Sequence, residues 1–249
     1  MAKNRLDQAL VDRGLCESRE KARRAVMAGT VRINGQVARK PSDTVKPGDA
    51  LALDIVDRYV SRGGHKLEYG LQHFALNVTG ATAVDLGAST GGFTDCLLQH
   101  GASKVYAVDV GHGQLAWKLR NDPRVIVMER TNARELSPAG FPAGFSGADL
   151  VVIDCSFISL TRILPAAVAL LKPLGRILAL VKPQFEAGKP EVDRGEGVIT
   201  DPLIHQRVLN ELEQFVSAGG CLAWRGTTTS PLLGPAGNKE FLVLLETIA

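Results

Sequence analysis

The chain has 249 residues, which is enough for one large domain, or for one large and one small domain. Its composition, with 45% hydrophobic and 22% charged residues, excludes wholesale disorder and a coiled coil. Four cysteines that form no CxxC pair and no Cys/His cluster predict neither a metal site nor a disulfide framework. The polar start of the chain predicts no secretory signal peptide, and the most apolar stretch, 163–181, is interrupted by two prolines and two cations. We therefore expect a soluble, cytoplasmic protein without a membrane partner.

The net charge of +3 is distributed unevenly along the chain. Residues 1–40 contain ten lysines and arginines and four acidic residues. Residues 66–249 contain 16 lysines and arginines and 18 acidic residues. A small basic segment in front of a near-neutral body indicates that the front segment binds a polyanion. A solvated helix face is the alternative explanation for such a charge run.

Hydrophobic periodicity predicts a small mixed domain at 1–60. Apolar residues at helical spacing predict two short helices, one through 6–10 and one through 22–27. The spacing then changes to two residues, the Asn34–Gly35 pair is typical of a hairpin turn, and a further strand is predicted at 49–55. A unit of this size buries little core, so we expect it to be stabilised by its neighbour or its ligand.

Six cations on or beside these elements are the candidate RNA-binding residues: Arg5, Arg19, Lys21, Arg23, Arg24 and Arg32. Cations on a helix beside a hairpin can follow the phosphates of structured RNA. The segments 5–7, 18–23, 28–35 and 45–49 resemble, in this order, the RNA-binding domain named after ribosomal small-subunit protein S-four. The resemblance implies that the front domain docks RNA and not DNA. A basic protein-interaction module is the alternative.

From residue 81 onward, apolar runs alternate with helical stretches. Five runs have strand character: 81–86, 104–109, 124–128, 149–154 and 176–181. Helices are predicted at 92–100, 113–120 and 159–171, and a later one at about 203–218. Near-continuous apolar runs separated in this way indicate buried parallel strands with crossover helices.

Two last strands are predicted near 221–228 and 240–247. The segment between them is too short for a parallel crossover, so this pair is predicted to be antiparallel. Five parallel strands followed by an antiparallel pair is the layout of the seven-stranded methyltransferase fold. The predicted fold class is therefore α/β, with a seven-stranded Rossmann-like methyltransferase sheet at 81–249, a linker and leading helix at 61–80, and the small α+β RNA-binding domain at 1–60.

The first predicted strand of the sheet ends in a glycine-rich turn at 85–93, where the backbone can turn sharply and approach a ligand. The spacing is not GxGxxG, which weakens a nicotinamide assignment. The second strand ends in Asp109, 24 residues beyond Asp85, and an acid at this edge can bind both hydroxyls of a cofactor ribose. Together these features favour S-adenosylmethionine, and the alternative is that both acids only cap strand ends. The candidate cofactor-binding residues are Asp85, Gly87, Ser89, Gly91, Gly92, Phe93 and Asp109.

Four ionisable residues lie at predicted strand ends or element starts: Lys66, Asp154, Lys182 and Glu240. Open parallel sheets bind ligands at the carboxyl ends of their strands, which places Asp154 and Lys182 beside the cofactor pocket. Each alone is compatible with a surface charge. In this order, the four resemble the catalytic tetrad of the FtsJ-like ribose 2′-O-methyltransferases. Asn132 stands where that family has an Asp near the adenine, and it completes the candidate cofactor-binding set.

The whole chain, with both domains in this order, resembles the TlyA family, proteins historically called haemolysins that methylate ribosomal RNA. The resemblance covers nearly all 249 residues and includes the segments 61–67 and 182–186. It implies methyl transfer from S-adenosylmethionine to a ribose 2′-hydroxyl of ribosomal RNA, free or within a ribosomal subunit. Our hypothesis is that Lys182 is the general base, Asp154 orients it and the methyl group, and Lys66 with Glu240 completes the hydrogen-bond network.

Three alternatives remain open from the sequence. Base methylation is the nearest: adenine chemistry commonly uses an Asn-Pro-Pro-Tyr-like loop where this chain has Asp-Cys-Ser-Phe, and pyrimidine carbon chemistry needs a nucleophile such as Cys155. The second is a non-catalytic RNA-binding ribosome-assembly factor. The third, pore formation, lacks a spanning segment. The segment 186–202 is predicted to be either a substrate-binding lid or a disordered surface loop.

Overall fold

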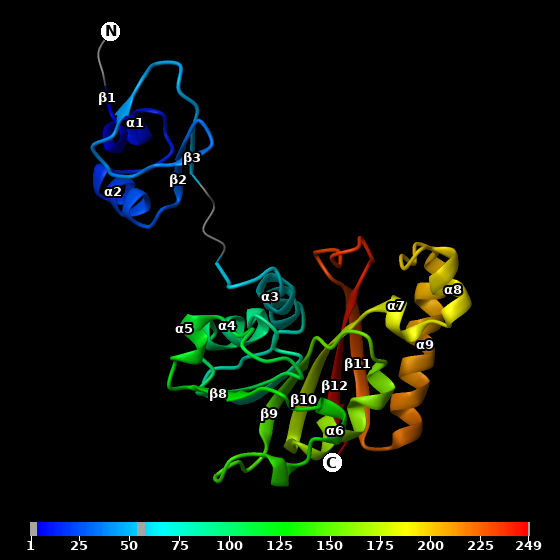
Figure 1. Cartoon of the computed structure of the whole chain (residues 1–249). Coiled ribbons are helices and arrows are strands. Elements are labelled where there is room, and N and C mark those ends of the chain that lie inside the picture. The colour runs from blue at the N-terminus through cyan, green and yellow to red at the C-terminus, as the bar shows by residue number, and fades with distance from the viewer. Residues whose placement is uncertain (1–3, 54–57, 249) are drawn as a thin grey trace. The chain divides into compact units, whose positions relative to one another are not determined.

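The computed structural model describes residues 4–53 and 58–248. The chain divides into two compact units, Met1–Arg58 and Tyr59–Ala249, which we call the N-terminal and C-terminal units (Figure 1). The limits predicted from the sequence for the three segments, at residues 60 and 80, stay predictions. Within the described residues, no helix has both the length and the apolar character needed to cross a membrane.

The N-terminal unit joins two helices to two small sheets. The elements are β1 (Asn4–Arg5), α1 (Leu6–Asp12), α2 (Arg19–Met27), β2 (Val31–Ile33), β3 (Gln36–Val37), β4 (Thr44–Val45) and β5 (Leu51–Leu53). Strands β3, β2 and β5 form one antiparallel sheet, and β1 pairs with β4. Its hydrophobic core is small: Leu6, Ala9, Leu10, Ala22, Val26, Val31, Ala38 and Val45.

The predicted hairpin turn is confirmed. Asn34 and Gly35 both have positive φ, at 51° and 81°, as the tight turn between β2 and β3 requires. Both predicted helices are present, and the strand predicted at 49–55 is observed as β5, while positions 54 and 55 lie outside the described residues. The short β1–β4 ladder was not predicted, because a two-residue strand has no measurable hydrophobic period.

The C-terminal unit is built on one seven-stranded sheet in the order β11-β12-β10-β9-β6-β7-β8. Its strands are β6 (Thr82–Leu86), β7 (Lys104–Val108), β8 (Val125–Met128), β9 (Ala148–Ile153), β10 (Leu171–Val181), β11 (Leu222–Thr229) and β12 (Phe241–Thr247). Strands β6 to β10 are parallel, and β12 runs antiparallel to both β10 and β11. The predicted fold class is therefore confirmed, including the antiparallel pair.

Helices cover both faces of this sheet. They are α3 (Gly63–His73), α4 (Gly92–Gln99), α5 (Trp117–Arg120), α6 (Leu164–Ala169), α7 (Pro183–Glu186), α8 (Lys189–Arg194) and α9 (Pro202–Gly219), with 3-10 turns η1 (Ala133–Glu135), η2 (Pro138–Gly140) and η3 (Leu160–Arg162). One core layer packs α3, α4 and α5 against the sheet, and the other packs α6 and α9 against the opposite face. Residues alternate between the layers along a strand: in β6, Ala83 belongs to the first layer and Val84 to the second.

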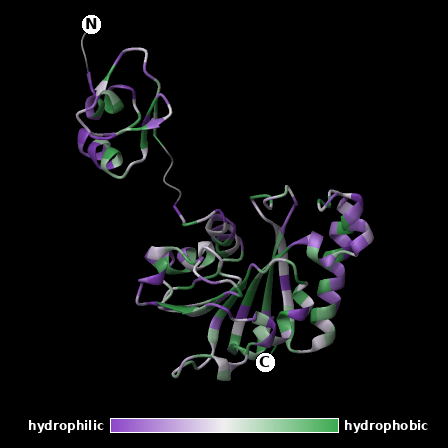
Figure 2. Ribbon diagram, viewed as in Figure 1, coloured by the Kyte–Doolittle hydropathy of each residue, from purple (hydrophilic) through white to green (hydrophobic). Residues whose placement is uncertain are grey.

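Two helical predictions and one loop prediction need correction. The helix predicted at 113–120 is only α5, because Gly113 is left-handed, with φ at 72°. The helix predicted at 159–171 is η3 followed by α6, and the chain then enters β10 at Leu171. The segment 186–202 contains α8, so it is not a structureless loop, and Figure 2 shows α8 as mainly hydrophilic while the strands of the sheet are mainly hydrophobic.

Candidate active site and RNA-binding surface

A cavity of about 530 Å³ opens at the carboxyl edge of the sheet, within the usual size range of small-molecule sites. Its wall is formed by the turns that follow β6, β7, β8 and β9. Polar and backbone groups reach it from each of these turns: Gly87 and Ser89, Asp109 and Gln114, Asn132 and Arg134, and Asp154 to Phe157.

Glycine at position 87 allows two of these turns to touch. Gly87 has φ at 87°, and a Cβ at this position would lie 2.8 Å from the backbone oxygen of Asp154. A side chain there would force the turn after β6 away from the turn after β9. The glycine at position 87 therefore lets the glycine-rich turn after β6 lie directly against the turn that carries Asp154.

Asp109 holds two of the turns together. One carboxylate oxygen accepts the backbone N–H of Ser89 at 2.8 Å, and the other accepts the backbone N–H of Gly111 at 2.7 Å. A carboxylate has about four acceptor positions, so both oxygens keep capacity for a ligand in the cavity. In sheets of this kind an acid at the end of the second strand can bind the ribose of a nucleoside cofactor, and for Asp109 this role stays a prediction.

The eight predicted cofactor residues divide into two groups. Gly87, Ser89, Asp109 and Asn132 line the cavity, whereas Asp85, Gly91, Gly92 and Phe93 lie outside its described lining. Asp85 is fully buried beneath the turn and accepts a hydrogen bond from the Thr94 hydroxyl at 2.6 Å, and burial raises its pKa to about 7. The backbone at 91 and 92 begins α4, and Phe93 packs in the core beside α3.

Asn132 lines the cavity with a side chain that also has local partners. Its amide donates to Glu135 at 2.8 Å, and its oxygen accepts the backbone N–H of Arg134 at 3.1 Å. The side chain thus begins η1 as an N-cap. Its contact with an adenine stays a prediction.

The four predicted catalytic residues form two lysine–carboxylate pairs. Lys66 of α3 donates to Glu240, directly before β12, at 2.5 Å, and both side chains are buried. Lys182, directly after β10, lies 2.6 Å from the carboxylate of Asp154, directly after β9, and donates to the Ser156 hydroxyl at 2.9 Å. One oxygen of Glu240 has no hydrogen-bond partner among the described residues.

Strand register brings the two pairs together. Val181 is paired with Phe241 across β10 and β12, so Lys182 and Glu240 are the next facing positions of two antiparallel strands. Such positions have Cα atoms about 4.5–5.5 Å apart. On the other side of β10, Ala179 pairs with Ile153, which directly precedes Asp154. Four segments far apart in the sequence therefore deliver these residues to one place at the sheet edge.

Two aromatic residues near Lys182, Phe157 and Phe185, were not predicted as site residues. The Phe157 side chain is 90% exposed at the cavity, with φ at 63°, a strained value for a bulky residue. Its ring lies 5.0 Å from that of Phe185, and the Lys182 ammonium lies 6.0 Å from the Phe185 ring centre. The sequence places Phe157 three residues after Asp154 and Phe185 three residues after Lys182. It does not predict that the Phe157 ring is exposed.

Glu186 connects the two segments that carry the Lys182–Asp154 pair. Located at the end of α7, it accepts the Ser159 hydroxyl at 2.6 Å and the backbone N–H of Leu160 at 2.8 Å, at the start of η3. Burial raises the pKa of this carboxyl group. The carboxylate thus joins the chain that follows Lys182 to the chain that follows Asp154.

The six predicted RNA-binding cations differ in their partners within the N-terminal unit. Arg5 and Arg19 contact the buried Asp7. Lys21 and Arg24 form ion pairs with exposed acids four residues earlier, Glu17 just before α2 and Glu20 within it. Arg32 donates to the backbone oxygen of Gly35 at 3.3 Å, and Arg23 is exposed on α2.

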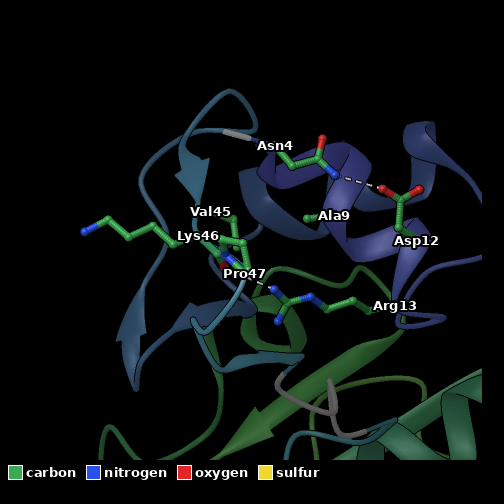
Figure 3. A pocket seen from close by; sticks show the side chains of 7 residues that line it. All are labelled: Asn4, Ala9, Asp12, Arg13, Val45, Lys46 and Pro47. Carbon is green, nitrogen blue, oxygen red and sulfur yellow. Dashed lines mark hydrogen bonds between the residues drawn. The ribbon is translucent and has the colours of Figure 1, made fainter. Parts of the chain in front are cut away.

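None of these six cations lines the pocket of about 380 Å³ that the N-terminal unit forms between α1 and β4. Figure 3 shows that Arg13 extends toward the backbone there, donating to the oxygens of Asp49 at 2.6 Å and Lys46 at 3.3 Å, while the Lys46 side chain points away. Asn4 likewise donates to Asp12 at 2.9 Å. The Arg13 and Asn4 side chains of this pocket are therefore engaged within the fold, and an RNA-binding surface around Arg5 and α2 stays a prediction.

Comparison with known proteins supports both units. The FtsJ-like methyltransferase family matches residues 59–247, and the S4 domain family matches residues 4–51. The 16S/23S rRNA (cytidine-2'-O)-methyltransferase TlyA of Mycobacterium tuberculosis is 48% identical over 247 residues, covering 98% of this chain and 90% of that protein. Hemolysin A of Brachyspira hyodysenteriae is 41% identical over 239 residues, covering 96% and 98%.

A solved structure extends this similarity to three dimensions. A protein from Streptococcus thermophilus named as a hemolysin superposes with a TM-score of 0.74 at 46% identity, and the match covers 99% of this chain and 89% of that one. Family match, identity and coverage agree on the same order of an S4 domain followed by a methyltransferase domain. The chain therefore belongs to the TlyA family of FtsJ-like methyltransferases with an N-terminal S4 domain.

Proposed function

We propose that this protein transfers a methyl group from S-adenosylmethionine to a ribose 2′-hydroxyl of ribosomal RNA. The observation that carries the proposal is the pair of lysine–carboxylate contacts, Lys182 with Asp154 and Lys66 with Glu240, held at the cavity edge of the sheet. The relative from Mycobacterium tuberculosis, named as an rRNA (cytidine-2'-O)-methyltransferase, supports the same substrate class. Such a substrate implies a cytoplasmic site of action.

The cavity residues suit a nucleoside cofactor. Asp109 offers carboxylate lone pairs for ribose hydroxyls, and Gly87 lets the turn after β6 lie against the backbone of Asp154 at the cavity. When bound, S-adenosylmethionine supplies a methyl group already activated on a sulfonium. The main task left to the protein is alignment, a positioning effect worth up to about 7–11 kcal/mol in ideal intramolecular systems.

Lys182 is the proposed group that holds the 2′-oxygen and accepts its proton. Asp154 and Ser156, both in the turn after β9, contact its Nζ and limit its orientation. Lys66 holds Glu240 at the adjoining position, and this buried pair completes the proposed hydrogen-bond network beside Lys182. The exposed Phe157 ring beside this cluster provides a face on which a nucleobase can stack.

The structure disfavours methylation of a pyrimidine carbon. That reaction needs a cysteine thiolate, and burial raises the pKa of Cys155 to about 12. Its thiol donates to the backbone oxygen of Leu86 at 3.4 Å, which is the behaviour of a packed structural cysteine. Adenine amino methylation is disfavoured because Asp154 is engaged with Lys182.

The test uses methyl-labelled S-adenosylmethionine with free ribosomal RNA, separate subunits and assembled ribosomes. A 2′-O-methyl group blocks alkaline cleavage at its own nucleotide, so we expect labelled RNA with one gap in the hydrolysis ladder. Lys182→Ala should remove the gap while RNA and cofactor stay bound, because the loss lies in the transition state. Lys182→Arg should fail as well, since a guanidinium remains protonated.

The matched control is Lys172→Ala. Lys172 lies near the other end of β10, paired with Asp149 at 2.9 Å, and its replacement should leave the gap intact. Labelled RNA with an unbroken ladder would contradict ribose chemistry. A fully active Lys182→Arg protein would contradict proton acceptance by Lys182 but not methyl transfer.

A further inference from the structure

One buried carboxylate in the N-terminal unit serves two surface arginines. Asp7, in the first turn of α1, accepts the Nε and Nη2 hydrogens of Arg5 at 3.1 and 3.0 Å, one on each oxygen. It also accepts an Nη2 hydrogen of Arg19, at the start of α2, at 3.1 Å. The Asp7 side chain is 0% exposed, whereas those of Arg5 and Arg19 are 53% and 54% exposed.

The shared oxygen brings the two guanidinium groups close together. Both Nη2 atoms contact the same Oδ2 of Asp7, so they lie no more than about 6 Å apart. Two like charges at this distance repel each other, and the carboxylate between them offsets this repulsion. Each guanidinium has five N–H donors, of which Arg5 uses two and Arg19 one on Asp7, so solvent-facing donors remain on both groups.

The other paired cations of α2 are held differently. Lys21 and Arg24 contact Glu17 and Glu20, whose side chains are themselves exposed. Exposed ion pairs of this kind are weak and their side chains reorient easily. In contrast, Asp7 is anchored by the core and by its backbone N–H, which donates to the Pro41 oxygen at 3.0 Å. The two arginines also hold the pKa of Asp7 down at about 2, so it remains ionised at neutral pH.

We propose that Asp7 is a positioning residue for RNA, which holds the guanidinium groups of Arg5 and Arg19 as a preformed pair that binds a backbone phosphate. The proposal rests on the RNA-docking role of the N-terminal unit. Guanidinium forks match the oxygens of a phosphate, and a pair fixed before binding loses less side-chain freedom on binding. Asp7 itself does not touch the RNA.

For Asp7→Asn, the proposal predicts a change in RNA affinity opposite to the change expected from net charge alone. Asp7→Asn makes the domain more basic, so charge alone would leave RNA affinity unchanged or increase it. If Asp7 positions the arginines, affinity should fall by about tenfold, the equivalent of one charged hydrogen bond. The matched control is Asp12→Asn on the same helix, an equal change of charge at an exposed acid that accepts hydrogen bonds from the side chains of Asn4 and Gln8.

The experiment measures Kd of the full chain for a structured ribosomal RNA fragment, with thermal melts of each variant. We expect Asp7→Asn to bind more weakly than wild type, and Asp12→Asn to bind equally or more tightly. Arg5→Ala with Arg19→Ala should weaken binding, and adding Asp7→Asn to that double variant should have no further effect. Equal affinity of Asp7→Asn and Asp12→Asn would overturn the proposal, and so would a further loss in the triple variant, which would show that Asp7 acts only through folding.

A second variant leaves Asp7 in place. Arg5→Lys with Arg19→Lys keeps both charges but not the forks, so it should also bind more weakly, and wild-type affinity would overturn the proposal whether or not Asp7→Asn folds. The RNA-docking role fails separately, if the double alanine variant binds RNA as tightly as wild type. If the RNA-docking role is wrong, none of the arginine variants loses RNA affinity. If only the Asp7 proposal is wrong, the double alanine variant still binds RNA more weakly, while Asp7→Asn does not.

Discussion

Both units pair lysines or arginines with carboxylates, and they expose these pairs to solvent in opposite ways. In the N-terminal unit the acid is buried and the cations face outward, as in Asp7 with Arg5 and Arg19. At the candidate active site of the C-terminal unit the lysines themselves are buried: Lys66 and Lys182 have side chains only 8% and 10% exposed. A cation that binds a polyanion must be reachable, whereas a lysine that directs a proton acts best where water is scarce.

The hydrophobic cores of the two units differ in size. The N-terminal unit has one small hydrophobic cluster, while the sheet of the C-terminal unit is covered by large clusters on both faces. A large core can hold buried charges in a fixed geometry, at the cost of their desolvation. The small unit buries few charged groups among its described residues, so its cations are replaceable with less effect on folding.

The largest expected effect on stability comes from breaking a buried pair. Lys66→Ala leaves Glu240 buried without its cation, which should lower the free energy of unfolding of the C-terminal unit by about 3–5 kcal/mol. Lys21→Ala, which breaks an exposed ion pair in the N-terminal unit, should change the free energy of unfolding of that unit by about 0.5 kcal/mol or less. Urea titrations of both variants measure the contrast, and similar small losses would contradict it.

The next effect concerns the exposed cations. Reversal of Arg19, Arg23 and Arg24 to Glu should weaken RNA binding by about a hundredfold or more and reduce the salt dependence of Kd, because three phosphate partners are lost. The affinity for S-adenosylmethionine should not change. Filter binding over a range of salt concentrations, with calorimetry of the cofactor, checks both statements. RNA affinity equal to wild type would refute the assignment of α2 to the RNA-binding surface.

A smaller effect is expected at the cavity. Asp109→Ala removes the ligand-facing lone pairs and also the contacts to Ser89 and Gly111. Hydrogen bonds to a charged acceptor contribute about 1.5–3 kcal/mol, so affinity for S-adenosylmethionine should fall about tenfold to a hundredfold. Asp122→Ala is the control, since that acid pairs with Arg124 at 2.7 Å and does not line the cavity. Calorimetry that gives equal affinities would rule out the ribose-binding role.

The smallest effect is a difference in pH dependence between two buried acids. The pKa of Asp85 is raised to about 7, above its value in the unfolded chain, so its contribution to stability falls as pH rises from about 4 to 7. The pKa of Asp7 is lowered to about 2, so its contribution is present above about pH 4 and is lost as pH falls toward 2.

Asp85→Asn removes the first of these dependences. The variant should gain about 1–2 kcal/mol relative to wild type at pH 8 and less at pH 5, because the neutral amide has no ionisation to suppress. Denaturant unfolding of the two proteins at both pH values measures the gain. An equal difference at both pH values would show that Asp85 is ionised in the folded protein.

Much of the site was predictable from the sequence because its signals are local. Runs of apolar residues, the glycine-rich turn and a connector too short for a crossover led to the sheet and to its antiparallel end. Carboxyl ends of parallel strands share one edge, so the sequence alone predicts that Asp109, Asp154 and Lys182 lie in the same region. Their roles in binding and catalysis remain to be tested by the variants above.

Only the tertiary structure decided which groups meet. The insertion of β12 between β10 and β11 places Glu240 beside Lys182, and no local pattern specifies that order. The burial that separates Asp85 from the cavity, the exposure of Phe157 and the joining of Arg5 and Arg19 by Asp7 likewise depend on packing between distant segments. Hydrophobic period and turn chemistry are set by neighbouring residues along the chain, whereas burial and charge pairing are set by what the fold packs around a side chain.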